Sequence, residues 1–130
     1  MLMIDVDHFK RVNDTFGHQA GDHVLVRLCE LINKSLRGPD LVGRMGGEEF
    51  AVVLPETGLE QTVQITERLL NSVREEAIEV EPETDVKVTV SIGVATVPPL
   101  APDLDAVMIA ADRALYRAKS MGRDCCCTAD

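Results

Sequence analysis

The stretch Gly46-Gly47-Glu48-Glu49-Phe50 lies between two apolar, strand-like segments at 41–45 and 50–54. Glycine enters the positive-φ region without steric cost, so two glycines between such segments predict a tight β-hairpin. Two carboxylates follow the turn directly. Carboxylates beside a glycine turn suit a hard cation and a ligand that comes close to the backbone. The stretch therefore predicts a hairpin with a ligand site at its tip.

A second group of acids follows the apolar segment at 1–6, which is predicted to be a buried strand. Asp5 stands at its carboxyl end, where open α/β sheets tend to bind ligands. If this strand pairs beside the hairpin, Asp5 and Glu48 converge, and two carboxylates together with phosphate oxygens suit Mg²⁺. Asp5 can equally be an edge acid without a ligand, because Asp at strand ends commonly forms turns.

The hydrophobic periodicity of the remaining chain predicts alternating helices and strands. Helices are expected at 10–16, from about 22 to 36, after a Thr57–Glu60 capping box to about 76, and from an Asp103 cap to Gly122. The alternation over 86–94 predicts a strand, and 125–128 a short last strand. The acidic stretch 79–85 is expected to be a solvated connection, and Pro98, Pro99 and Pro102 a loop.

This order of elements predicts an α/β (α+β) fold with a mixed central β-sheet surrounded by helices. The length of 130 residues corresponds to one domain, over 1–130. The net charge of −9 argues against general binding of nucleic acid or of anionic membranes. No apolar run approaches the roughly 20 residues of a membrane span. The cysteines, Cys29 and Cys125 to Cys127, lack CxxC spacing, which favours reduced thiols in a cytoplasmic protein over a zinc site.

Three cations are candidates for binding a triphosphate. Lys10 follows Phe9 at the start of a predicted helix, whose free backbone N–H groups bind phosphate well. Lys119 and Arg123 lie at the end of the last predicted helix. Basic residues at that position also complement the helix dipole without any ligand.

Asn13 and Asp22 could read a base, because an amide and a carboxylate complement the donor and acceptor edges of guanine. Their spacing also fits a turn residue and a helix cap. Farther along the chain, Arg37-Gly38-Pro39-Asp40 fits a surface ion pair of little energy, yet an arginine fork also matches phosphate. The residues alone leave both pairs of alternatives open.

These segments together resemble the GGDEF family of diguanylate cyclases, here in a GGEEF form. The resemblance runs along essentially the whole chain, through Asp5-Val6-Asp7-His8-Phe9-Lys10, Asn13-Asp14, Phe16-Gly17-His18, Gly21-Asp22, Arg44, the hairpin, Ser91-Ile92-Gly93, Ala111-Asp112 and Gly122-Arg123. It implies a fold similar to the nucleotidyl-cyclase and polymerase palm. It also implies condensation of two GTP into cyclic di-GMP and two pyrophosphates. Because one domain would hold one GTP, catalysis is expected to need a homodimer.

The resemblance also assigns roles to residues. It implies that Asp5, the Val6 carbonyl, Glu48 and Glu49 bind one or two Mg²⁺ or Mn²⁺ ions, and that Glu48, Glu49 and Lys10 are catalytic. The substrate-binding residues that it implies are His8, Phe9, Lys10, Asn13, Asp22, Lys119 and Arg123. Arg37, Asp40 and Arg68 would form an inhibitory site for cyclic di-GMP.

The chain departs from the family pattern at its start, where the helix that normally precedes the first strand is missing. The sequence is therefore interpreted as an N-terminally truncated domain of a protein with a sensory or dimerising domain upstream, which could anchor it to a membrane. A catalytically inactive module that binds GTP or cyclic di-GMP and signals through a partner remains the alternative function, and an inert fragment a third.

Overall fold

The computed structural model describes residues 1–97 and 103–129. The predicted loop of Pro98, Pro99 and Pro102 lies outside these residues. The elements are β1 (Leu2–Val6), α1 (Phe9–Phe16), α2 (His18–Ser35), β2 (Leu41–Gly46), β3 (Glu49–Val53), α3 (Leu59–Glu75), β4 (Ile78–Glu81), β5 (Thr84–Val86), β6 (Val90–Val94), α4 (Leu104–Ser120) and β7 (Cys126–Thr128). No helix in the described part of the chain is long and apolar enough to cross a membrane.

Strand β1 is the centre of a five-stranded sheet with the order β2-β3-β1-β6-β7. It pairs antiparallel with β3 on one side and with β6 on the other, and β7 adds parallel to β6. Ile4 stands opposite both Phe50 and Ile92, which places three buried apolar side chains in one row. The predicted mixed sheet is confirmed.

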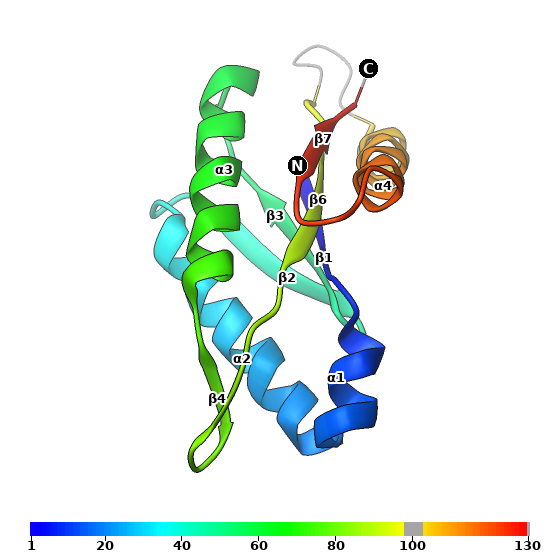
Figure 1. Cartoon of the computed structure of the whole chain (residues 1–130). Helices are drawn as coiled ribbons and strands as arrows, with labels where there is room; N and C mark the ends of the chain where they lie inside the picture. The colour runs from blue at the N-terminus through cyan, green and yellow to red at the C-terminus, as the bar shows by residue number, and fades with distance from the viewer. Residues whose placement is uncertain (98–102, 130) are drawn as a thin grey trace.

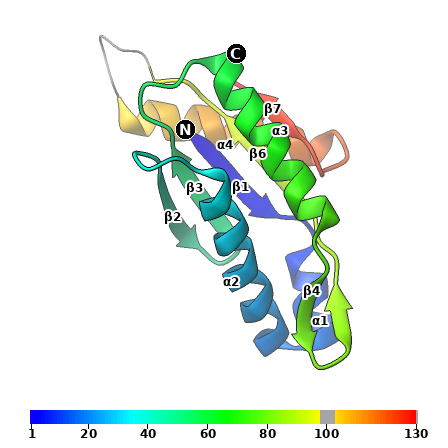
Figure 2. The same cartoon turned by 90° about the vertical axis from the view of Figure 1, so that its left-hand side faces the viewer.

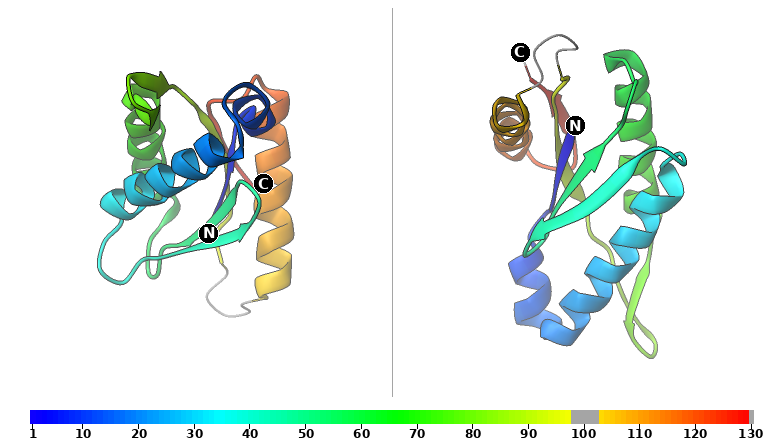
Figure 3. Two further views of the ribbon diagram at one scale, coloured as in Figure 1. Left: turned by 90° about the horizontal axis from the view of Figure 1, so that it is seen from below. Right: turned by 180° about the vertical axis from the view of Figure 1, so that it is seen from behind.

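Helices cover the two faces of this sheet unequally (Figure 1). Helices α2 and α3 lie on one face, and α4 lies on the other, as the view from behind also shows (Figure 3). Leu2, Ile4 and Val6 belong to the large core beneath α2 and α3, whereas Met3 packs with Val107 and Leu115 of the opposite layer. Because strand side chains alternate between faces, Asp5 and Asp7 share the α4 side with Met3.

The acidic stretch 79–85 is not a solvated connection but part of a β-hairpin, β4–β5. Its carboxylates are exposed, while Ile78 and Val80 alternate with them and are buried in the large core. Figure 1 and Figure 2 show the hairpin at the same end of the molecule as α1, packed against α2. The prediction was wrong because the many acidic residues of the stretch outweighed the alternating apolar pair Ile78 and Val80. Burial of these two side chains stabilises the hairpin.

The strand predicted over 86–94 is divided between two sheets. Val86 pairs with Ile78 in the small sheet, whereas Val90 pairs with Val6 in the central one. Val86, Val88 and Val90 are all buried, so the alternation correctly reports burial. The alternation does not show whether a single strand pairs with the whole segment. In the structure the chain changes its partner strand between residues 86 and 90.

The predicted Thr57–Glu60 capping box is wrong. Helix α3 begins at Leu59 with Gly58 as its N-cap, and no side chain caps it. The Thr57 hydroxyl instead donates to the Pro55 carbonyl and accepts a hydrogen bond from Arg37. By contrast, Asp103 does cap α4, since its carboxylate accepts from the Ala106 N–H at 3.3 Å.

Gly93 sets how closely α4 approaches the sheet. A Cβ on Gly93 would lie 2.1 Å from the Ala111 carbonyl oxygen and 2.4 Å from the Leu115 nitrogen. Both are backbone atoms of α4, so the clash could not be relieved by a side-chain rotation. The absence of a side chain at Gly93 therefore permits the contact between α4 and β6.

We expect Gly93→Ala to lower the free energy of unfolding by about 2 kcal/mol or more, because overpacking would displace a whole helix. Gly43→Ala is the matched control, since Gly43 also lies in a strand and a Cβ there would have no atom within 4 Å. Urea unfolding of the two variants measures the difference. Equal stability of the variants would contradict the close approach.

Candidate active site at the end of strand β1

The predicted acids meet at the end of β1. Asp5 is paired with Glu49 in the antiparallel register of β1 and β3. The Val6 N–H donates to the Glu48 carbonyl at 3.3 Å, so the hairpin tip lies beside the last residue of β1. The turn itself uses positive φ at both Gly46 and Gly47. The structure thus brings Asp5, Val6, Glu48 and Glu49 together, as the sequence predicts.

The cluster carries more negative than positive charge. Burial raises the pKa of Asp5, and Glu48 and Asp7 raise it further, whereas the Lys119 ammonium, 2.8 Å from Oδ2, opposes this. Burial also raises the pKa of Glu49, with contributions from Asp5 and Asp112. Asp5 is only 5% exposed, so water does little to offset the repulsion.

A divalent cation suits this cluster chemically. The donors are carboxylate oxygens, which Mg²⁺ prefers, and the surplus negative charge is what a cation would neutralise. Among residues 1–97 and 103–129, no three His, Cys, Asp or Glu side chains are already arranged around one point as a complete ligand set. Any ion held here would therefore need oxygen ligands from a substrate or from water as well.

The N-terminus of α1 faces the same edge of the sheet, because α1 begins only three residues after β1 ends (Figure 1). His8 is its N-cap, with φ at 55°, and Phe9 and Lys10 are its first two residues. Lys10 is exposed and Phe9 packs against the core. Lys119 reaches the cluster from the end of α4, and Arg123 lies in the turn that follows.

Asn13 and Asp22 lie close together because Asn13 packs against Gly21, the residue before Asp22. A Cβ on Gly21 would lie 1.9 Å from Asn13 Oδ1, so the Asn13 side chain rests on the backbone of the residue before Asp22. Asn13 Oδ1 is buried and has no hydrogen-bond partner in the described part of the chain. Asn13 lies within α1 and Asp22 within α2, where Gly17 is the N-cap. The interpretation of the pair as a turn residue and a helix cap is therefore wrong.

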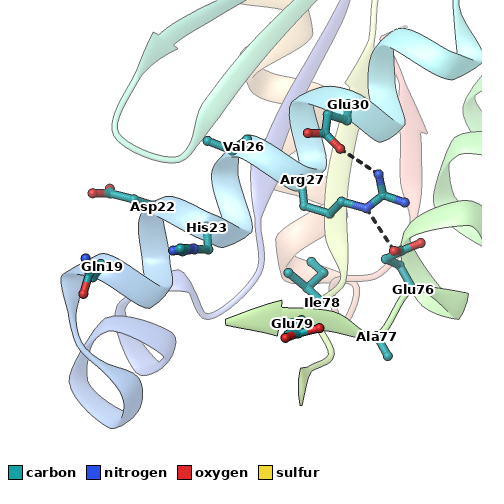
Figure 4. A pocket seen from close by; sticks show the side chains of 10 residues that line it. All are labelled: Gln19, Asp22, His23, Val26, Arg27, Glu30, Glu76, Ala77, Ile78 and Glu79. Atoms are coloured by element: carbon teal, nitrogen blue, oxygen red, sulfur yellow. Dashed lines mark hydrogen bonds and ion pairs between the residues drawn. The ribbon is translucent and has the colours of Figure 1, made fainter. Parts of the chain in front are cut away.

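Asp22 borders two cavities on opposite sides of α2. One, of about 400 Å³, lies between α2 and the β2–β3 hairpin and is lined by Asp22, Leu25, Val26, Cys29, Val42, Gly43, Arg44 and Phe50. The other, of about 550 Å³, lies between α2 and β4. There Arg27 bridges Glu30 and Glu76 (Figure 4). We refer to the first as the α2–β2 cavity.

Arg37 and Asp40 form more than a surface ion pair. The Asp40 carboxylate is buried and accepts from the Arg37 backbone N–H at 2.8 Å and from its Nε and Nη2. The Arg37 hydrogen bonds hold the pKa of Asp40 below its usual range. Arg68 of α3 donates to the Ser35 carbonyl at 3.2 Å, two residues before Arg37. The three predicted inhibitory-site residues therefore lie near one another.

Three residues that shape the site have no role predicted from the sequence. Arg44 Nε donates to the Gly47 carbonyl at 2.9 Å and so braces the hairpin turn. Asp112 adds negative charge near Glu49 from α4. Asp7 lies just past β1 and accepts hydrogen bonds from Thr89 and Ser91. The sequence pointed to these residues only because each occurs in a segment that resembles the family. Their roles depend on partners that are not adjacent to them in the sequence.

The family model for the diguanylate cyclase GGDEF domain matches residues 1–125. The chain belongs to the GGDEF domain family. It is 40% identical to DgcT of Escherichia coli, a probable diguanylate cyclase, over 95% of this chain and 28% of DgcT. The chain spans about a third of the length of the curated relatives that it matches.

Solved structures agree with this assignment. The GGDEF domain of YfiN (TpbB) from Pseudomonas aeruginosa superposes with a TM-score of 0.94 at 37% identity, covering 99% of this chain and 80% of that one. The GGDEF domain of DgcB from Caulobacter crescentus, solved in complex with cyclic di-GMP, gives a TM-score of 0.90 at 34% identity, covering 98% and 75%. The predicted fold class is thereby confirmed.

We expect Glu49→Gln to raise the melting temperature at neutral pH, because it removes a carboxylate whose charged form is disfavoured by burial and, to a smaller extent, by repulsion from Asp5 and Asp112. Each gain of about 1 kcal/mol would appear as roughly 4 °C. Glu49 has a raised pKa in the folded protein, so its destabilising effect develops as pH rises from the unfolded pKa through the folded one.

The advantage of Glu49→Gln should therefore shrink as the pH is lowered through the carboxylate range. Thermal unfolding at a series of pH values measures this. Glu75→Gln is the control, because Glu75 is exposed at the end of α3. An advantage that grew toward acid pH would contradict the assigned penalty on the charged form.

Proposed function

We propose that this domain condenses two GTP molecules into one cyclic di-GMP, with release of two pyrophosphates. The observation that supports this most is the convergence of Asp5, Glu48 and Glu49 beside the N-terminus of α1. Surplus carboxylates next to free helix N–H groups suit a metal–triphosphate complex. A module that only binds nucleotide would not need all three of these carboxylates.

Asp5, Glu48 and the Val6 carbonyl would hold Mg²⁺ or Mn²⁺, and the family resemblance allows one or two ions. The ion would supply positive charge to the phosphoryl oxygens. Lys10, Lys119 and Arg123, with the backbone of His8 and Phe9, would bind the phosphates and orient them. Glu49 would accept the proton of the attacking 3′-hydroxyl, and its raised pKa makes it a stronger base than an ordinary carboxylate.

The guanine would bind next to Asp22, between the contact of Asn13 with Gly21 and the α2–β2 cavity, which is about 400 Å³ and is lined by Asp22 and Arg44 among apolar side chains. The Asp22 carboxylate can accept hydrogen bonds from the guanine N1–H and amino group. Asn13, held against Gly21 with an unpartnered Oδ1, would complete the recognition of the base edge. A buried polar atom without a partner costs free energy, and a bound nucleotide would remove that cost.

Each of the two phosphodiester linkages of the product joins one nucleotide to the other. The 3′-oxygen of one GTP would attack the α-phosphorus of the other, and the bond from that phosphorus to pyrophosphate would break. Glu49 would accept the proton of the 3′-hydroxyl. Residues 1–97 and 103–129 form one such acidic site, so we propose that two copies face each other and that catalysis needs a homodimer. Positioning of the two substrates would then account for much of the rate.

We further propose that residues 1–130 act as the catalytic domain of a longer cytoplasmic or membrane-anchored protein with a sensory or dimerising domain upstream. The curated relatives are about three times as long as the matched region. Arg37, Asp40 and Arg68 would bind cyclic di-GMP as a feedback inhibitor. Their support is the cluster of two guanidinium groups at the end of α2.

Incubation of the protein at high concentration with GTP and Mg²⁺ should yield cyclic di-GMP, detected by mass-resolved chromatography. Glu48→Ala should lower the rate roughly 100-fold or more, because loss of a metal ligand removes several kcal/mol of charge stabilisation. Glu75→Ala should behave as wild type, since Glu75 is exposed at the end of α3.

Product from Glu48→Ala at the wild-type rate would overturn the metal site. No product from the wild type, together with GTP or cyclic di-GMP binding in calorimetry, would favour the binding module instead. ATP in place of GTP should give no product if Asp22 reads guanine.

Arg68→Ala should raise the cyclic di-GMP concentration that halves the rate by about 10-fold, which is the loss expected for one hydrogen bond to a charged group. Initial rates measured with added product give this concentration. Arg113→Ala on the exposed side of α4 should leave it unchanged. Identical inhibition of wild type and Arg68→Ala would exclude Arg68 from the site.

A further inference from the structure

Asp7 connects segments that are far apart in the sequence. The residue is 4% exposed. One oxygen accepts from the Ser91 hydroxyl at 2.6 Å, and the other from the Thr89 hydroxyl at 2.6 Å and from the Asp124 backbone N–H at 3.0 Å. Asp7 is thereby satisfied entirely within the protein, unlike its neighbour Asp5. Its third donor belongs to the turn between α4 and β7.

Arg74 of α3 holds the same turn from the other side. Its Nε donates to the Asp124 carboxylate at 2.7 Å, and its Nη2 donates to the Asp124 backbone carbonyl at 2.7 Å. Its Nη1 donates to Asn71 at 2.8 Å, which fixes the guanidinium on α3. Asp124 is therefore bound at its N–H, its carbonyl and its side chain.

The turn held in this way has an unusual backbone. Gly122, Arg123 and Asp124 have consecutive φ values of 114°, 66° and 50°. Positive φ is unfavourable for a side chain as large as that of arginine, so the surrounding contacts must maintain it. The Arg123 N–H also donates to the Ala118 carbonyl at 3.1 Å, which ties the turn to the end of α4. Lys119 follows Ala118 and reaches Asp5.

We propose that Asp7, Arg74 and Asp124 are positioning residues that fix the α4–β7 turn so that Arg123 is held for the phosphates of the nucleotide. We call these three residues the turn clamp. The inference rests on the proposed function, because Arg123 and Lys119 act there as phosphate-binding groups. The clamp touches neither substrate nor metal. Its effect should therefore depend on the number of phosphates in the ligand.

Arg74→Met removes the two hydrogen bonds from Arg74 to Asp124, leaves the bond from the Asp124 N–H to Asp7, and retains the aliphatic stem. Arg11→Met is the matched control, because Arg11 lines the same cavity as Arg74 and the charge change is identical. Asp124→Asn is a milder second variant, since asparagine tolerates positive φ and keeps the N–H for Asp7. Circular dichroism confirms folding, and Asp124→Asn carries the test if Arg74→Met does not fold.

The first readout is hydrogen exchange over residues 118–126 in nucleotide-free protein. Exchange there should be at least 10-fold faster in Arg74→Met and unchanged in Arg11→Met. The second readout is calorimetry with Mg²⁺ and either α,β-methylene-GTP, which resists turnover at the α-phosphorus, or GMP. Arg74→Met should bind the triphosphate about 10-fold more weakly and bind GMP within about 2-fold of wild type.

Unchanged exchange in both Arg74→Met and Asp124→Asn overturns the clamp without reference to any ligand. Faster exchange with unaltered triphosphate affinity, or with an equal loss for GMP, overturns the positioning role. An equal loss of affinity in Arg11→Met also overturns it, because charge alone would then explain the effect. Failure of the wild type to bind either nucleotide overturns the proposed function and the positioning role together, and is recognised in the unmodified protein.

Discussion

The burial of negative charge at the end of a central strand is the constraint on which this structure depends. Strand β1 is buried on both faces. Asp5 in this strand and Asp7 just beyond it are buried as well, so two carboxylates lie in the protein interior. A buried charge is costly unless it is paired or hydrogen-bonded. Asp5 is paired with Lys119 of α4, and Asp7 accepts hydrogen bonds from two hydroxyl groups and from the Asp124 N–H. These partners connect the sheet to the end of α4.

The two acids are compensated to different degrees, and this separates their roles. Asp7 accepts three hydrogen bonds and can serve as a fixed support. Asp5 has one ammonium partner but faces Glu48 and Glu49, so the region around it keeps surplus negative charge. A cation bound with a phosphorylated ligand would balance that surplus. The end of one short strand and the residue just beyond it therefore provide both a structural anchor, Asp7, and an acidic site suited to a cation, around Asp5.

Two glycines bring the helices close enough for this arrangement. Gly93 lets the backbone of α4 approach β6, which brings Lys119 and Asp112 near the acids. Gly21 lets Asn13 of α1 rest on α2 beside Asp22. Both positions accept close contact because no Cβ intervenes, and neither uses a positive φ. Backbone proximity, more than backbone flexibility, is the reason for glycine at these two places.

Local periodicity, turn chemistry and ordered motifs were enough to predict the central strand, the hairpin at Gly46-Gly47, the long helices and the resemblance to a family. Several properties depended on the tertiary structure alone. The pairing of β4 with β5 rests on Ile78 and Val80 packing in the core, and the division of 86–94 rests on a change of partner strand. The support of Asp124 by Asp7 and Arg74 joins residues 117 and 50 positions apart. Such contacts leave no periodic signal in the chain, because they depend on which segments meet after folding.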